Sequence, residues 1–369
     1  MKQDIVNVLN EIEKNGFEAY IIGGYVRDKL LGIESYDIDI ATSALPKDLI
    51  KIFNISSKRT TMYGTMKLLS NKYRFDIATY RKELSYDGRR PDNIEYIKSL
   101  KEDILRRDFT INTIAMNKNG DILDYQNGIK DLQNKIIKSV GDANLKLKED
   151  PLRILRALRF SIVLDFKIDD YLLKSIKKNI RLIKTLSSTR IKEELSKILI
   201  SRNCVEGLEF MKKLGVLKLL NISYKNLVYV DDINGMYAQI NLFKDYPFTK
   251  EEKNNINIIK NIKDRGKIDN ITLFNYGLYH SMVAGQILGY DKEEIALINK
   301  NLPIKSKKDL AINFNDIKLI LNTDENVLVV NTINDLINNI LLNKLKNEKD
   351  DLVYYVINQR KWLFWTWKY

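Results

Sequence analysis

Two aspartates, Asp37 and Asp39, flank a single isoleucine in the stretch YDIDIA at residues 36–41. Successive side chains of a β-strand point to opposite faces, so both carboxylates would project together while Ile38 and Ile40 turn toward a core. Hard divalent cations prefer oxygen ligands, and two-metal sites hold their ions between carboxylates. The same pattern also fits a solvated strand edge, so the pair by itself leaves two interpretations open.

A third carboxylate, Asp76, lies between Phe75 and Ile77 in RFDIATYR. On a strand it would face away from both apolar neighbours, as the first two aspartates do. It would join them at one metal site if its strand lay beside theirs, and that strand order cannot be read from the sequence.

Gly23 and Gly24 in IIGGYVRDKLLG separate a β-like run from a helix that begins near Tyr25. Such a junction lets backbone amides approach a phosphate at the positive end of the helix, and Arg27 in the first turn can add a charge-assisted contact. An ordinary tight turn before a helix has the same pattern, so this signal is weak alone.

The stretch LRRDFTINTIAMN brings Arg107 and Asp108 close to Asn112. An arginine can clamp a phosphate or a base edge, while Asp or Asn can bond ribose hydroxyls. The alternative interpretation is the charged start of a helix.

In EDPLRILRALRF, Asp150 precedes a proline that suits the first position of a helix, and Arg153, Arg156 and Arg159 recur every third residue after it. Asp150 and Arg153 match the Watson–Crick edge of cytosine and adenine, whose amine donates to a carboxylate and whose ring nitrogen accepts from a guanidinium. Guanine and uracil present the reverse order. The pair would therefore select C and A without a template, at about 1–3 kcal/mol for each bidentate match. The alternative is an amphipathic helix with a basic face.

The predicted secondary structure that positions these residues changes near Gly141, from alternating strands and helices to helices alone. Before it, short β-like runs alternate with helical ones; after it, EDPLRILRALRFSIVLD and the Lys-, Asn- and Ile-rich remainder show helical apolar spacing. The sequence therefore predicts an α/β head followed by an all-helical arm.

The composition favours a polyanionic partner such as nucleic acid, because 61 Lys and Arg against 48 Asp and Glu give the 369 residues a net charge of +13. The single cysteine, Cys204, excludes an internal disulfide and fits a reducing cytoplasm. The single histidine, His280, excludes a metal site built from several imidazoles. We expect neither a signal peptide nor a membrane span.

Five ordered stretches resemble motifs A to E of the class II tRNA nucleotidyltransferases, the CCA-adding enzymes, which share a polymerase-β-like head with bacterial poly(A) polymerases. The resemblance covers about residues 18–200. The stretches are GGYVRDKLLG with DIDIAT, RRDFTINTIAMN, DYQNGIKDLQNKIIKSVG, EDPLRILRALRF and TRIKEELSKIL. The resemblance implies an α+β fold, with a polymerase-β-like nucleotidyltransferase head built on a mixed sheet and an all-helical neck, body and tail after it.

The resemblance also implies a role for each matched residue. Asp37 and Asp39 would be the catalytic magnesium ligands, and Asp76, where the family commonly has glutamate, a possible third carboxylate. Asp150 and Arg153 would select ATP and CTP. The remaining nucleotide-binding residues would be Gly24, Arg27, Arg107, Asp108, Arg156 and Arg159.

The implied domains are a catalytic head at 1–140, a neck with the nucleotide-selecting helix at 141–202, a helical body at 203–290 and a tRNA-binding tail at 291–369. The implied partners are tRNA, held at its acceptor and T arms, with CTP and ATP; no protein partner is implied. The implied activity is template-independent, Mg2+-assisted addition of CCA to the 3′ end of tRNA.

The alternatives are a bacterial poly(A) polymerase, an enzyme that adds only CC or only A, or a catalytically inactive RNA-binding relative. Within the family, CC-adding enzymes tend to lack a flexible loop between motifs A and B. The loop SYDGRRP at residues 85–91 is present here, which favours full CCA addition.

Overall fold

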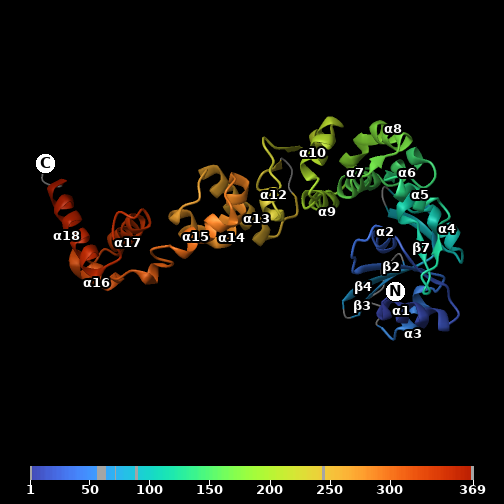
Figure 1. The fold of residues 1–369 in the computed structure, drawn as a ribbon, viewed down its shortest axis with the longest axis horizontal. Coiled ribbons are helices and arrows are strands. Elements are labelled where there is room, and N and C mark those ends of the chain that lie inside the picture. The colour runs from blue at the N-terminus through green and yellow to red at the C-terminus, as the bar shows by residue number, and fades with distance from the viewer. Residues whose placement is uncertain (1, 56–63, 71, 88–89, 243–245, 367–369) are drawn as a thin grey trace. The chain divides into compact units, whose positions relative to one another are not determined.

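The computed structural model describes the chain except for residues 1, 56–63, 71, 88–89, 243–245 and 367–369 (Figure 1). The chain folds as two compact units. The first comprises residues 1–223 with 242–247, and the second comprises residues 224–241 with 248–369.

Among the described residues, the first unit begins with a six-stranded sheet in the order β3-β4-β2-β1-β7-β8. β2 and β4 pair in parallel, whereas the other neighbours are antiparallel, so the sheet is mixed, as predicted. The strands are β1 (Ala19–Ile22), β2 (Asp37–Thr42), β3 (Thr65–Ser70), β4 (Tyr73–Thr79), β7 (Ala115–Met116) and β8 (Ile122–Leu123).

The alternation along β2 orients the two aspartates. Ile38 and Ile40 are each 1% exposed in the core, while Asp37 and Asp39 lie on the open face. This is the arrangement that a period of two residues dictates. The helices of this part are α1 (Gln3–Lys14), α2 (Gly24–Leu30), α3 (Pro46–Ile52), α4 (Leu100–Leu105) and the 3-10 turn η2 (Thr110–Asn112).

A separate antiparallel hairpin, β5 (Arg81–Asp87) with β6 (Arg90–Tyr96), lies between β4 and α4 in the chain. It coincides with the loop predicted to be the flexible one, whose tip at residues 88–89 and whose side chains at residues 84–93 lie outside the described residues.

Helices follow the sheet within the first unit (Figure 1). Among them, α7 carries Arg153, Arg156 and Arg159. It begins one residue later than expected, at Leu152, and the carboxylate of Asp150 accepts a hydrogen bond from the Leu152 amide at 3.0 Å. The helices are α5 (Gly128–Gln133), α6 (Ala143–Glu149), α7 (Leu152–Leu164), α8 (Asp170–Asn179), η3 (Ile180–Thr185), α9 (Ser188–Leu199), α10 (Cys204–Lys213) and α11 (Val216–Leu219).

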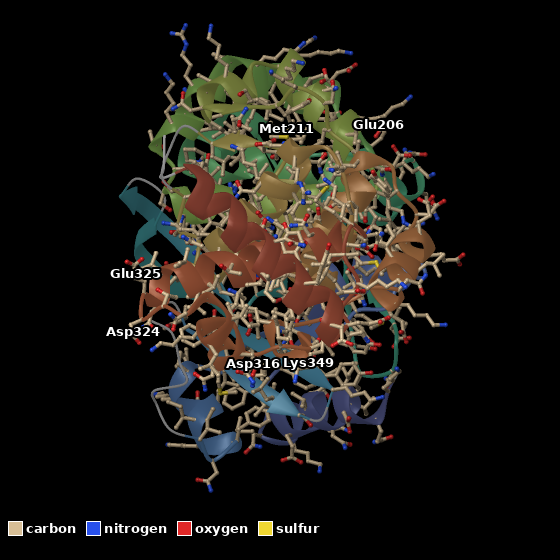
Figure 2. All side chains as sticks on the ribbon, turned by 90° about the vertical axis from the view of Figure 1, so that its left-hand side faces the viewer. Glu206, Met211, Asp316, Asp324, Glu325 and Lys349 are labelled. Carbon is tan, nitrogen blue, oxygen red and sulfur yellow. The ribbon has the colours of Figure 1, made fainter. Side chains whose placement is uncertain are left out.

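Two pairs of short strands lie among these helices. β9 (Ile136–Ile137) pairs with β10 (Lys167–Ile168), and β11 (Ile222–Ser223) pairs with β12 (Asn241–Leu242). On α10, Met211 is 1% exposed whereas Glu206 points to solvent (Figure 2), so this helix packs by one face.

The second unit is helical apart from Asn241 of β12, and its C-terminal half has a core of its own. Ile317, Leu336 and Leu352 from three of its helices are fully buried in that core. The helices are α12 (Ile233–Tyr237), α13 (Lys250–Arg265), α14 (Asn270–Leu288), α15 (Lys292–Lys300), η4 (Lys307–Asp309), α16 (Phe314–Leu321), α17 (Asn326–Leu341) and α18 (Lys349–Thr366). Within the described part of the chain, no helix is both long and apolar enough to cross a membrane.

Candidate active site

The strand order brings the three predicted carboxylates to one face of the sheet. Asp39 on β2 is in register with Asp76 on the neighbouring parallel strand β4, so the two side chains project from the same face. Asp37 lies two residues earlier on that face. The strand pairing therefore places Asp76 beside the first pair, which the sequence alone left open.

Asp37 makes an ion pair that is open to solvent. Arg74 donates from Nε to Oδ1 at 2.7 Å and from Nη2 to Oδ2 at 3.3 Å, and both side chains are 71% exposed. Exposed ion pairs stabilise by less than about 1 kcal/mol. Arg74 is therefore easily displaced by an ion that needs Asp37.

Asp39 has the most perturbed charge of the three. Although its side chain is reached from the open face, desolvation by the surrounding protein raises its pKa to about 6; Asp76 and Asp37 add to the rise, while Arg107 and Arg156 oppose it. The turn before α2 also approaches this carboxylate closely. A Cβ at Gly23, where φ is 83°, would lie 3.0 Å from Oδ2 of Asp39.

The donor chemistry of this face fits a hard divalent cation, since the carboxylates of Asp37, Asp39 and Asp76 all lie there and such cations prefer oxygen ligands. No group of three or more His, Cys, Asp or Glu residues is already close enough to enclose an ion in the part of the chain that the structure describes. The carboxylates on this face would therefore need side-chain adjustments before they could enclose an ion together.

A cavity of about 370 Å3 opens beside Asp39 and joins the sheet to α7. Most of the phosphate- and sugar-binding residues predicted from the sequence meet here. The lining comprises Gly23, Gly24, Arg27, Asp39, Arg107, Asp108, Asn112, Arg156, Arg159 and Phe160. Four arginines and the carboxylate of Asp39 line this cavity, and arginines are the side chains best suited to bind phosphates.

Asp108 organises the cations of this cavity. It accepts a hydrogen bond from Nε of Arg156 at 2.7 Å and from Nδ2 of Asn112 at 3.1 Å. Asn112 in turn accepts from Nη1 of Arg27 at 2.7 Å. Burial alone would raise the pKa of Asp108, but Arg156 and the hydrogen bonds from Asn112 and the Phe109 amide lower it to about 2. The carboxylate is therefore ionised at neutral pH and fixes two of the arginines.

Phe160 provides an aromatic surface beneath the arginines. The guanidinium carbons of Arg27, Arg156 and Arg159 lie 5.0, 5.4 and 3.8 Å from its ring centroid. Contacts of this length are attractive because the ring face is negative. Phe160 was not predicted as a site residue, since its position as the last residue of the motif carries no sign of where the ring lies.

The predicted base-selecting pair lies outside the lining of this cavity. Arg153 is 7% exposed and donates to the carbonyl oxygens of Arg106 at 2.9 Å and Lys146 at 3.2 Å, and to Glu149 at 3.3 Å. The carboxylate of Asp150 accepts a hydrogen bond from the Leu152 amide at 3.0 Å, and its carbonyl oxygen accepts one from the Arg153 amide at 3.0 Å. The guanidinium of Arg153 is therefore held by three protein acceptors.

One carboxylate that was not predicted as a site residue, Asp103 on α4, is fully buried. It accepts hydrogen bonds from Nε of Arg106 at 2.9 Å, Nη2 of Arg107 at 3.1 Å and the amide of Arg81 at 3.1 Å. Burial opposes its ionisation, yet Arg107 and Arg106 lower its pKa below the ordinary value. Asp103 thus directs Arg107 into the cavity and ties it to the stem of the β5–β6 hairpin.

Three family models match consecutive parts of the chain. Residues 19–138 match the poly(A) polymerase head domain, residues 165–222 match the RNA- and SrmB-binding site of polymerase A, and residues 235–356 match domain 2 of tRNA nucleotidyltransferases.

Full-length relatives decide the family. The CCA-adding enzyme of Ligilactobacillus salivarius is 34% identical over 379 residues, which cover 94% of each chain. The CCA-adding enzyme of Limosilactobacillus reuteri is 35% identical over 338 residues, which cover 83% of this chain and 84% of that one. This chain belongs to the CCA-adding enzyme family. The family predicted from the five motifs is thereby confirmed, and the poly(A) polymerase alternative is not favoured.

Solved structures of CCA-adding enzymes share the fold. The Bacillus stearothermophilus enzyme in complex with CTP matches with a TM-score of 0.81 at 24% identity and covers 98% of each chain. The Thermotoga maritima enzyme complexed with tRNA matches with a TM-score of 0.69 at 20% identity over 97% of this chain and 96% of that one. The predicted fold class, a polymerase head followed by helices, is confirmed.

Proposed function

We propose that this chain adds CCA to the 3′ end of tRNA, using CTP and ATP as substrates. The proposal is based on the position of Asp39, which lies on the carboxylate-bearing face of the sheet and also lines a cavity with four arginines. That juxtaposition suits nucleotidyl transfer, which needs anionic metal ligands beside cations for a triphosphate. The names of the full-length relatives specify which transfer it is.

In this proposal Asp37 and Asp39 are the catalytic carboxylates and would hold Mg2+. The chemistry that Mg2+ supplies when bound is activation of the attacking hydroxyl and stabilisation of charge on the leaving pyrophosphate. Arg74 would have to release Asp37 for that carboxylate to bind an ion, and their exposed pair is weak enough to allow it.

The arginines act on the triphosphate. Arg27 and Arg156 are held in place by Asn112 and Asp108, and Arg107 is held by Asp103. Pre-positioned cations neutralise charge as it develops in the transition state without having to reorganise. We assign Gly24, Arg107, Asp108 and Arg159 to the same nucleotide site, with Gly24 at the positive end of α2.

Base selection is assigned to Asp150 and Arg153. Their donor and acceptor order suits C and A and opposes G and U. Arg153 donates to the backbone carbonyl of Arg106, and the next residue, Arg107, lines the cavity. A movement of Arg153 toward a base would therefore break a contact next to the phosphate site.

We further propose residues 1–140 as the catalytic head, 141–202 as the neck, 203–290 as the body and 291–369 as a tail that holds tRNA. The family model over residues 19–138 is consistent with the head boundary, whereas the models over residues 165–222 and 235–356 cross the proposed neck–body and body–tail boundaries. We also propose a cytoplasmic location, which suits the single, buried cysteine.

The test is incubation of the purified protein with tRNA that ends at the discriminator base. CTP alone should add two residues, ATP alone should add none, and both together should add CCA and stop. Repeated A addition to unrelated RNA would instead indicate a poly(A) polymerase. Addition of only CC or only A would indicate a partial enzyme, and no addition at all an inactive RNA-binding relative.

A further inference from the structure

Arg74, on β4, holds the exposed carboxylate of Asp37, and it lies outside the five sequence motifs. Its Nε donates to Oδ1 at 2.7 Å and its Nη2 donates to Oδ2 at 3.3 Å, so the planar guanidinium engages both oxygens. With respect to the described residues, this is the only ion pair that Asp37 makes. Both oxygens of a predicted metal ligand are therefore already bound to a cation.

The strand pairing fixes the position of Arg74. It lies directly opposite Asp37 in the parallel pair of β2 and β4, and its amide donates to the carbonyl oxygen of Tyr36 at 3.0 Å. Neighbouring strands lie about 4.8 Å apart, a distance that an arginine side chain spans easily. Because side chains alternate between the two faces, Arg74 and Asp76 share the open face with Asp37 and Asp39. The register thus places one guanidinium among the three carboxylates.

A divalent ion and Arg74 need the same oxygens. Ionised carboxylates on neighbouring strands repel each other, and a cation beside them reduces that repulsion. Arg74 supplies such a cation to Asp37. An ion bound at the same oxygens would lie close to the guanidinium, and two positive charges that are close together repel. Arg74 and the ion are therefore alternative counter-ions of Asp37.

Arg74 is able to leave Asp37, unlike the arginines of the nucleotide cavity. The side chains of Arg74 and Asp37 are each 71% exposed, so the guanidinium can turn into water at little cost. Arg27 and Arg107, by contrast, are only 10% and 16% exposed and are each held by a neighbouring carboxylate. Arg74 is therefore the cation beside the carboxylates that a divalent ion can displace.

We propose that Arg74 competes with divalent metal for Asp37 and thereby sets the affinity of the carboxylate face for that metal. The inference rests on the assignment of Asp37 and Asp39 as metal ligands in the proposed function. Arg74 is a positioning residue in this scheme, because it holds the Asp37 carboxylate while no ion is bound and leaves it as an ion binds. The metal affinity of this chain is therefore lower than its carboxylates alone would give.

The experiment measures Mn2+ binding, without nucleotide or RNA, by the wild type, Arg74→Ala, Arg74→Lys and Lys67→Ala. Mn2+ is the probe because it also binds carboxylates and its EPR signal reports the free ion; Mg2+ is then titrated as a competitor. Lys67 is the matched control. It is an exposed cation on β3, directly opposite Asp76, and so lies on the far side of β4 from Asp37.

Two further measurements complete the design. Arg74→Ala is also made together with Asp37→Asn, so that its effect can be compared with and without the carboxylate for which it competes. Thermal midpoints with and without Mn2+ show that each variant is folded. They also give a second measure of binding, since a ligand that binds the folded state raises the midpoint.

For Arg74→Ala we expect about fivefold tighter binding of Mn2+, the upper range for loss of one exposed ion pair, and a larger rise of the thermal midpoint with Mn2+. Arg74→Lys should tighten binding less, because lysine keeps the charge but cannot engage both oxygens with a planar fork. Lys67→Ala should change the affinity by less than about twofold. In the Asp37→Asn background, Arg74→Ala should no longer tighten binding.

Three results would overturn the inference: wild-type Mn2+ affinity in Arg74→Ala, equal tightening in Lys67→Ala, or a tightening that persists with Asp37→Asn. All three readouts are equilibrium binding and need no turnover. A wild type that binds Mn2+ as predicted but incorporates no nucleotide would refute the proposed function and leave this inference standing. An active wild type whose Mn2+ affinity is unchanged by Arg74→Ala would refute only this inference.

Discussion

Replacement of the buried Asp103 by asparagine should lower both the stability of the chain and its efficiency with CTP. Asparagine keeps the shape of the side chain but removes the negative charge that Arg106 and Arg107 face at 2.8 and 3.1 Å. Removing one partner of a buried ion pair costs about 3–5 kcal/mol. Both arginine side chains are 16% exposed and keep some hydration, so we expect the lower value, about 3 kcal/mol.

Urea unfolding of the full chain measures this loss. With a slope of about 3 kcal/mol per molar urea, the midpoint should fall by about 1 M. Arg107 lines the nucleotide cavity and loses the partner that directs it, so kcat/KM for CTP should also fall by about tenfold, or 1.4 kcal/mol. The control is Glu11→Gln, which breaks only an exposed pair with Lys14 and should cost less than about 1 kcal/mol.

Equal urea midpoints for Asp103→Asn and Glu11→Gln would refute this prediction. A lowered urea midpoint with unchanged kcat/KM would support the predicted loss of stability but contradict the predicted loss of efficiency with CTP. It would show that Asp103 stabilises the fold without directing Arg107.

Three further predictions concern the pKa of Asp39, the backbone conformation of Gly23 and base selection by Arg153. The pKa of Asp39, raised from 3.8 to about 6, means that the folded state binds its proton more tightly, so the stability of the metal-free wild type should fall as pH rises from about 4 to about 6. Asp39→Asn should remove that fall in pH-dependent unfolding curves; an identical curve would contradict the assignment. Gly23→Ala should lower the unfolding free energy by about 1–3 kcal/mol, because φ is 83° and the new Cβ would lie 3.0 Å from Oδ2 of Asp39; a wild-type melting curve would argue against that strain. Arg153→Ala should relax the preference for C and A over U and G in single-nucleotide incorporation, whereas unchanged selectivity in a folded variant would exclude Arg153 as the selecting residue.

Local periodicity made part of the site predictable. The alternation of apolar and acidic residues in β2 determines that Asp37 and Asp39 share a face, since one face of the strand must be buried. Ordered motifs identified the family, and composition indicated a polyanionic partner. These features depend on neighbours within a few residues or on sums over the chain.

The unpredicted features depend on contacts between distant segments. Asp76 meets Asp39 only because β4 pairs with β2, and Glu194 meets Arg159 only because α9 packs on α7. Asp103 reads as an ordinary acidic residue in the first turn of a helix, and only the packed fold surrounds it with arginines. Such long-range pairings leave no periodic trace in the sequence.

The central claim is that Asp39, at the edge of the arginine-lined cavity, carries out transfer of nucleotides to tRNA. It is tested most directly by comparing wild type and Asp39→Asn in one assay with Mg2+, CTP, ATP and tRNA that ends at the discriminator base, with tRNA binding measured in parallel. We predict that the wild type adds CCA and stops, and that Asp39→Asn binds tRNA with wild-type affinity but adds no nucleotide. Incorporation by Asp39→Asn at a rate near that of the wild type would contradict the account.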